Sequence, residues 1–163
     1  DLWLQWAEVV DHRPRHARFI GDMPHAWISS DYIRAALDLL TDAQIERNEQ
    51  LGKFVRAEVA RACGKSPLYV GTRGAGMMLG IGLNDLEHPW LSFDHFGVPG
   101  LADQPSVGVL LCYRMYKRGF YPFVCGHKWN TLRVLPRFTI DEATLTGFAN
   151  ALGEEMEYLC EQS

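Results

Sequence analysis

The segment Met77–Leu83 (MMLGIGL) has no polar side chain at any position, and this pattern constrains the fold more than any other. Such a run does not alternate between a buried and a solvated face, so it predicts a strand at the centre of a sheet. A preceding strand is predicted over residues 68–73, with a tight turn formed by the glycine-rich segment 74–76. Gly80 and Gly82 weaken the central strand unless something packs closely against its backbone.

Helical patterns lie on both sides of these strands. The most regular covers residues 41–63, where Thr41 and Gln44 have the spacing of a capping box. Apolar residues then recur at helical spacing until Gly64, a typical helix-ending residue. Similar signals predict three further helices, over residues 29–40, over residues 104–118, and after a capping Asp141.

Two further strands are predicted, over residues 120–124 and 132–135. The order of elements is therefore α-α-β-β-loop-α-β-β-α, which favours an α+β two-layer sandwich: a small, mostly antiparallel sheet covered by helices. The first 28 residues show no such pattern. We expect an irregular entry segment there and one domain over residues 29–163.

Size, charge and cysteine content exclude several classes of protein. The 163 residues suffice for one domain, and the formal net charge of −4 argues against a nucleic-acid-binding protein. No apolar run approaches the roughly 20 residues that span a bilayer. The four cysteines form no CxxC pair, so we expect reduced thiols in a cytoplasmic protein. Because Asp1 is not an initiator Met and no signal peptide follows, we expect a chain cut from a longer protein or processed.

No motif for catalysis or metal binding is complete. Cys125–His127 lacks further ligands at the spacing that a zinc site needs, so no metal site is predicted. The glycine-rich segment 71–80 leads into a strand rather than a helix, which does not fit a nucleotide-binding loop. Lys128 is a loop lysine, for which a solvated charge is the ordinary interpretation and a Schiff base the alternative. We assign no catalytic residue.

Arg133 is the strongest candidate for a binding residue. It lies between Leu132 and Val134 in an apolar strand, where a buried guanidinium without a partner would be strongly destabilising. Three environments remain open for it: solvent beside an edge strand, an ion pair with an acidic residue of the chain, or the carboxylate of a ligand. Its planar fork suits the last, because it can donate two parallel hydrogen bonds to a carboxylate.

Two motifs, with a helix ending at Gly119 between them and a terminal amphipathic helix, connect the chain to a known family. They are Arg73–Ile81 (RGAGMMLGI) and Asn130–Ile140 (NTLRVLPRFTI). Over about residues 41–163 the chain resembles the C-terminal small domain of class III (omega-type) pyridoxal-phosphate (PLP)-dependent aminotransferases, fold type I.

The resemblance implies a function and a set of partners. Arg133 would hold the substrate's carboxylate in an aminotransferase or aminomutase that acts on an amino acid or amine. PLP would be bound mainly by a large domain that lies outside this sequence, and the complete enzyme would be a homodimer. The amino donor, the acceptor and the choice between transamination, aminomutation and racemisation stay open.

The chain also departs from the family. The family's Schiff-base lysine belongs to the large domain and Lys128 does not match its motif, so the chain alone should be inactive. Ala75 replaces the second arginine of the usual Arg-Gly-Arg-Gly motif. His25–Ser30 replaces the turn that contacts the cofactor phosphate, so no residue is assigned to cofactor binding.

Two other functions remain open. The domain could serve assembly or binding without catalysis, in which case it should be a soluble, folded monomer. Residues 19–40 are weakly similar to the tail of some six-hairpin glycosidases, which would suggest a fragment of a carbohydrate-active enzyme. Glycosidases need a spaced pair of carboxylates, and the sequence identifies no such pair.

Overall fold

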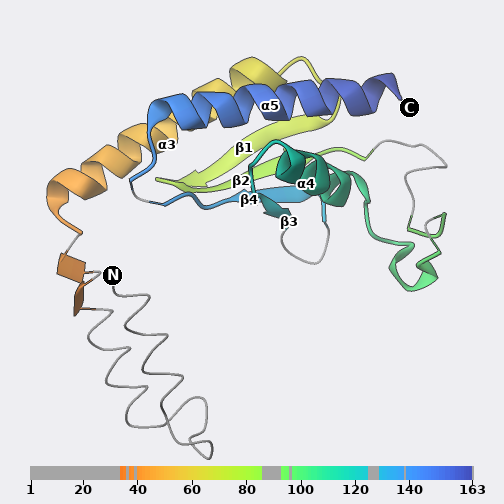
Figure 1. Ribbon diagram of the computed structural model, residues 1–163, viewed down its shortest axis with the longest axis horizontal. Coiled ribbons are helices and arrows are strands. Elements are labelled where there is room, and N and C mark those ends of the chain that lie inside the picture. The colour runs from red at the N-terminus through yellow and green to blue at the C-terminus, as the bar shows by residue number, and fades with distance from the viewer. Residues whose placement is uncertain are drawn as a thin grey trace, which may run out of the picture. The chain divides into compact units, whose positions relative to one another are not determined.

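The computed structural model describes residues 34–35, 37–38, 40–85, 93–95, 97–124, 129–137 and 139–162. The chain divides into two compact units, residues 1–45 and 46–163, and the second contains the sheet (Figure 1). In the first unit, residues 34–35 and 37–38 are helical. The predicted entry segment 1–28, the start of the first helix and the motif Cys125–Lys128 lie outside the described residues.

The sheet has four antiparallel strands in the order β1-β2-β4-β3. Hairpin β1–β2 is closed by two residues, Gly76 and Met77, and Gly76 has a φ of +50°, which glycine adopts without strain. Strand β2 lies between β1 and β4, which confirms the prediction of a central strand. The strands are β1 (Tyr69–Ala75), β2 (Met78–Leu83), β3 (Phe123–Val124) and β4 (Thr131–Val134).

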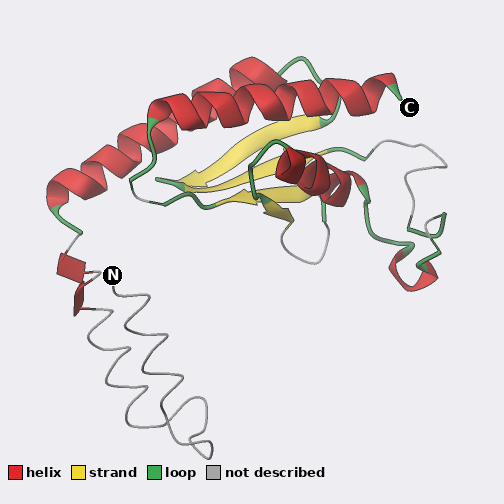
Figure 2. Ribbon diagram, viewed as in Figure 1, coloured by secondary structure: helices red, strands yellow, loops and turns green. Residues whose placement is uncertain are grey.

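Three helices form the second layer, and all pack their apolar residues into the core on one face of the sheet (Figure 2). They are α3 (Asp42–Cys63), α4 (Val107–Lys117) and α5 (Glu142–Glu161). Both predicted caps are present: Gln44 N donates to Thr41 Oγ1 over 3.2 Å, and Thr144 N donates to Asp141 Oδ1 over 2.7 Å. The α+β two-layer sandwich is confirmed.

Strand β2 is buried on alternate residues only. Leu79, Ile81 and Leu83 point into the core, whereas Met78 is 66% exposed on the other face. The strand is therefore apolar on both faces but buried on only one of them. The physical reason is that Gly80 and Gly82 occupy the second face, so the strand has little side chain to bury there.

Two predicted elements are shorter than expected. Strand β3 has two residues rather than the five predicted over 120–124, because Pro122 has no N–H to donate to a neighbouring strand. Helix α4 begins at Val107 rather than at Gln104, because the residue before a proline, here Pro105, is disfavoured in helical conformation.

Two contacts tie α3 to the hairpin β1–β2. A Cβ added to Gly52 of α3 would lie 2.0 Å from the carbonyl oxygen of Gly76, so only glycine allows this approach. Arg56 of α3 donates to the carbonyl oxygen of Gly74 over 3.4 Å. The turn of the hairpin is thus held against the helical layer. No helix among the described residues is long and apolar enough to cross a membrane.

Candidate functional site

Arg133 lies on the face of the sheet that the three helices leave uncovered. Strand β4 pairs Arg133 with Gly80 of β2 on one side and with Phe123 of β3 on the other, so it is not an edge strand. The side chain is exposed, and it forms no ion pair with any acidic residue that the structure describes. Neither an edge position nor an internal ion pair therefore accounts for this residue.

A second arginine occupies the same face. Arg73 of β1 pairs with Gly80 in the register of the hairpin, so one glycine separates the two arginines across the sheet. Residues directly opposite each other in antiparallel strands project to the same face. Sequence reasoning treated Arg73 only as part of a family motif, because the pairing of distant strands is not visible in the sequence.

A hollow of about 490 Å³ lies beside Arg73, and Arg133 is not among its lining residues. Gly71 of β1 and Gly82 of β2, which pair with each other, contribute to its lining and bring no side chain to fill it. Arg73, Thr131 and Asn84 add polar groups to its wall. The hollow has room for a small polar molecule close to a positive charge.

Large apolar side chains surround the arginines on the same face. Alternate residues of a strand project to the same face, and this places them on the uncovered side. Each is more than half exposed: Val70 62%, Met78 66%, Phe123 60% and Leu135 55%. Exposed apolar groups gathered on one face mark a surface that contacts another protein part or a ligand. We call this set, with Arg73, Gly80 and Arg133, the open sheet face.

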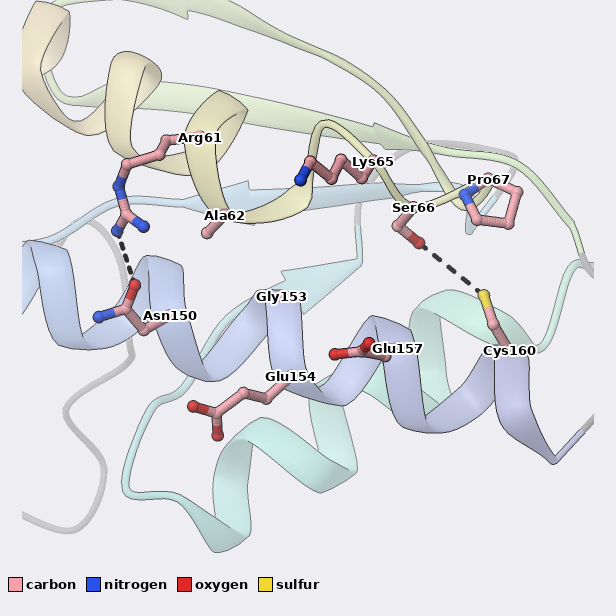
Figure 3. A pocket seen from close by; sticks show the side chains of 10 residues that line it. All are labelled: Arg61, Ala62, Lys65, Ser66, Pro67, Asn150, Gly153, Glu154, Glu157 and Cys160. Carbon is pink, nitrogen blue, oxygen red and sulfur yellow. Dashed lines mark hydrogen bonds between the residues drawn. The ribbon is translucent and has the colours of Figure 1, made fainter.

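A second hollow, of about 460 Å³, lies between the end of α3 and the helix α5 (Figure 3). Its polar groups largely satisfy one another: Arg61 donates to Glu58 over 2.8 Å and to Asn150 over 2.6 Å. Ser66 Oγ lies 3.8 Å from Cys160 Sγ. The contact between Arg61 and Asn150 joins the two helices, and the hollow is on the helical side of the domain, away from the open sheet face.

Two of the three described thiols, Cys63 and Cys112, are unsuited to act as nucleophiles. Burial raises the pKa of Cys63 to about 12 and that of Cys112 to about 11, so both stay protonated near neutral pH. The described residues also hold no cluster of His, Cys, Asp and Glu suited to a metal ion.

Comparisons with known proteins find aminotransferases that are similar to this chain in sequence and in fold. No family model matches the chain. In sequence it is 27% identical over 119 residues to the diaminobutyrate–2-oxoglutarate aminotransferase of Rhizobium meliloti, a match that covers 71% of this chain. In structure it is similar to acetylornithine aminotransferase from Elizabethkingia anophelis, with 22% identity, a TM-score of 0.59 and 90% of this chain covered. It is also similar to N-acetylornithine aminotransferase from Stenotrophomonas maltophilia, with 16% identity, a TM-score of 0.62 and 83% covered. The predicted resemblance to class III aminotransferases is confirmed.

The aminotransferase resemblance concerns only part of those proteins. The chain spans 23% of the Rhizobium meliloti protein and 31% and 32% of the two solved aminotransferases. Its α+β sandwich is consistent with the fold type I small domain.

The described residues of this aminotransferase-like domain place no lysine on the open sheet face. Lys53 belongs to α3, Lys65 follows that helix, and Lys117 belongs to α4, with its Nζ 4.8 Å from the centre of the Tyr113 ring. None of these lysines is on a strand of the open sheet face, and Lys128 lies outside the described residues. The cofactor's Schiff-base lysine is therefore not among the groups that the structure places near Arg133.

Proposed function

We propose that this chain is the small domain of a PLP-dependent class III aminotransferase or aminomutase, and that Arg133 binds the substrate's carboxylate. The observation that carries the proposal is an exposed guanidinium within an uncovered sheet face, without an acidic partner among the residues that the structure describes. A guanidinium in this position presents its donors to a ligand rather than to the protein.

A large PLP-binding domain would cover the open sheet face. The apolar side chains around Arg133 support this, because a chain that matches about a third or less of its aminotransferase relatives has a natural partner for such a surface in the remainder. PLP bound there would supply the electron-withdrawing group of the reaction. A homodimer of the complete enzyme, as the family resemblance implies, belongs to the same proposal.

The task of Arg133 in that assembly is orientation. Two parallel N–H···O bonds fix the plane and position of a carboxylate, and so fix the reacting carbon relative to the cofactor ring. Removal of such a charge-assisted contact weakens both substrate binding and the reactive geometry. The amino donor, the acceptor and the exact reaction class are properties of the complete enzyme.

The test uses the complete protein that contains this chain. We expect it to bind PLP, with a visible absorbance band, and to act on a carboxylate-bearing amine. Arg133→Ala should keep the band and lower kcat/KM about 100-fold, or about 2.8 kcal/mol at about 1.4 kcal/mol per factor of ten. The matched control is Arg137→Ala, which removes an exposed arginine outside the paired strands.

Three results would contradict the proposal. A complete protein without PLP would favour the alternative of a domain that serves binding or assembly without catalysis. Equal losses in Arg133→Ala and Arg137→Ala would show a general charge effect. Unchanged kinetics in Arg133→Ala would remove the carboxylate-binding role from this residue.

A further inference from the structure

Arg73, Gly80 and Arg133 form one row across the open sheet face. The register pairs Arg73 with Gly80 and Gly80 with Arg133, so all three project to the same side. Two strand spacings separate the backbones of the arginines, which amounts to about 10 Å. Two extended arginine side chains can reach a common point over that distance.

The side chain of Arg73 extends along this row. A Cβ added to Gly80 would lie 3.9 Å from both Cγ and Nε of Arg73, so the Arg73 side chain passes beside the space above the glycine. The same Cβ would lie 3.1 Å from Cγ2 of Thr131. The missing side chain at position 80 therefore leaves a gap beside the Arg73 side chain, with Thr131 at its base.

Arg73 and Arg133 differ from the arginines of the helices in the acceptors that surround them. None of the four strands that the structure describes contains an aspartate or glutamate, so the open sheet face carries two positive charges and no negative one on its strands. Two like charges that share a surface without a counter-ion form an anion-binding arrangement. By contrast, helical arginines donate to protein acceptors: Arg47 to Ile140 O, Arg56 to Gly74 O, Arg61 to Glu58 and Asn150, and Arg114 and Arg118 to Glu155.

We propose that Arg73 is a second binding residue for the substrate carboxylate, which enters the gap above Gly80 and is held by Arg73 and Arg133 from opposite sides. The inference rests on the proposed function of Arg133 and extends it. A carboxylate has about four acceptor positions on its two oxygens, enough for both guanidinium forks. The hollow lined by Gly71, Gly82 and Thr131 would take the remainder of the ligand.

The proposal makes Gly80 a specificity-determining position. Any side chain there would occupy the place of the carboxylate and lie against Thr131.

A neutral ligand of the same shape would bring no charge to either arginine, so the site should discriminate butyrate from butyramide.

The experiment is an NMR titration of the 163-residue chain with butyrate, with butyramide as the neutral probe. The Nε–Hε signals of arginine report each guanidinium separately. We expect butyrate to shift the signals of both Arg73 and Arg133, and butyramide to shift neither. Arg73→Ala and Arg133→Ala should each weaken butyrate binding at least about fivefold, as expected for loss of a charge-assisted contact. Arg137→Ala is the matched control and should bind butyrate as the unaltered chain does.

Two variants separate charge from geometry. Arg73→Lys keeps the charge and loses the planar fork, so it should bind butyrate with intermediate affinity. Gly80→Val should abolish butyrate binding, and its amide spectrum shows whether the sheet is intact. Arg73→Ala changes only an exposed strand residue, so it tests the proposal even if Gly80→Val does not fold.

The outcomes distinguish the two proposals. If Arg73→Ala binds butyrate normally while Arg133→Ala does not, the role of Arg73 is refuted and that of Arg133 stands. If the unaltered chain binds butyrate and butyramide equally or binds neither, the shared carboxylate site is refuted, whereas the kinetics of Arg133→Ala in the complete protein decide the role of Arg133 separately. A loss of equal size in Arg137→Ala would also overturn the inference, because it would show that only the net charge matters.

Discussion

At the scale of single residues, the buried carboxylate of Glu155 on α5 is paired with two arginines. Arg114 lies within α4, and Arg118 caps the C-terminal end of that helix. The Glu155 side chain is 5% exposed, Arg114 Nε donates to one oxygen, and Arg118 Nε donates to the other over 2.8 Å. Arg114 also lies over the ring of Tyr158, 3.7 Å from its centre. This network joins α4 to α5 on the side of the domain opposite the open sheet face.

We expect Glu155→Gln to destabilise the domain by about 2 kcal/mol. The amide keeps the size of the side chain but leaves Arg114 without a buried counter-charge, and the partial exposure of both arginines keeps the loss below that of a fully buried pair. Urea unfolding measures the change. Glu157→Gln, at an exposed position of the same helix, is the control and should stay within about 0.5 kcal/mol. Equal stability of the two variants would contradict the prediction.

The stability contributed by Glu155 should depend on pH in a defined direction. Burial raises the pKa of this carboxyl, but the hydrogen bonds from Arg114 and Arg118 outweigh burial and hold the pKa below its ordinary value of 4.5. A carboxyl with a lowered pKa in the folded state stabilises the protein above its unfolded pKa and loses that contribution as the pH falls through the folded value.

The difference in unfolding free energy between the unaltered chain and Glu155→Gln should therefore be constant near neutral pH. It should shrink as the pH falls below about 4.5. Urea unfolding of both proteins over a series of pH values measures this difference. A difference that stays the same at acidic pH would show that the charge of Glu155 is not the stabilising feature.

At the scale of elements, the packing of α5 on α3 depends on one glycine. A Cβ added to Gly153 would lie 2.7 Å from the carbonyl oxygen of Ala62, closer than real side chains approach a backbone. A second glycine of the same helix, Gly147, has no such neighbour, because its added Cβ would meet only Phe120 Cζ at 3.8 Å. The two positions are therefore a matched pair.

Gly153→Ala should destabilise the domain by about 1–3 kcal/mol, because α3 and α5 must move apart. Gly147→Ala should be neutral or stabilise it by up to about 1 kcal/mol, since alanine is the better helix former and finds only an ordinary contact. Thermal unfolding of both variants checks the opposite signs. A stabilising Gly153→Ala would show that the helices can separate without loss.

Most elements could be predicted from the sequence because their signals are local. The caps at Thr41 and Asp141 involve residues three positions apart, and the turn at Gly76 depends on a conformation that favours glycine. The burial of β2 on one face was foreseeable from Gly80 and Gly82, which leave the other face with little side chain to bury. The shortening of β3 was foreseeable from Pro122.

At the scale of the whole described domain, the helices cover one face of the sheet and leave the other with exposed apolar groups. Arg133 could be singled out from the sequence, because a charge within an apolar strand is unusual. The row that it forms with Gly80 and Arg73 could not, because the register joins β1, β2 and β4 across about 60 residues. Non-local pairing of this kind is set by packing and not by neighbouring residues.

The open sheet face should bind an apolar fluorescent dye when the 163-residue chain is isolated. Phe123→Ser should lower the dye fluorescence, because Phe123 is 60% exposed on the open sheet face, in its edge strand β3. The control is Val98→Ser, at a side chain that is 42% exposed and is not on the sheet. Equal fluorescence losses in both variants would contradict the assignment of dye binding to the open sheet face.

The two-residue turn of hairpin β1–β2 has a consequence for how this domain can change during evolution. Side chains of a strand alternate between faces, so an insertion at Gly76–Met77 that moved β1 by one residue against β2 would change the face of every β1 side chain. Arg73 would then rotate from the open face to the helical face, although no binding residue had been substituted. Loop length, as much as residue identity, would therefore separate descendants that keep the paired arginines from descendants that lose them.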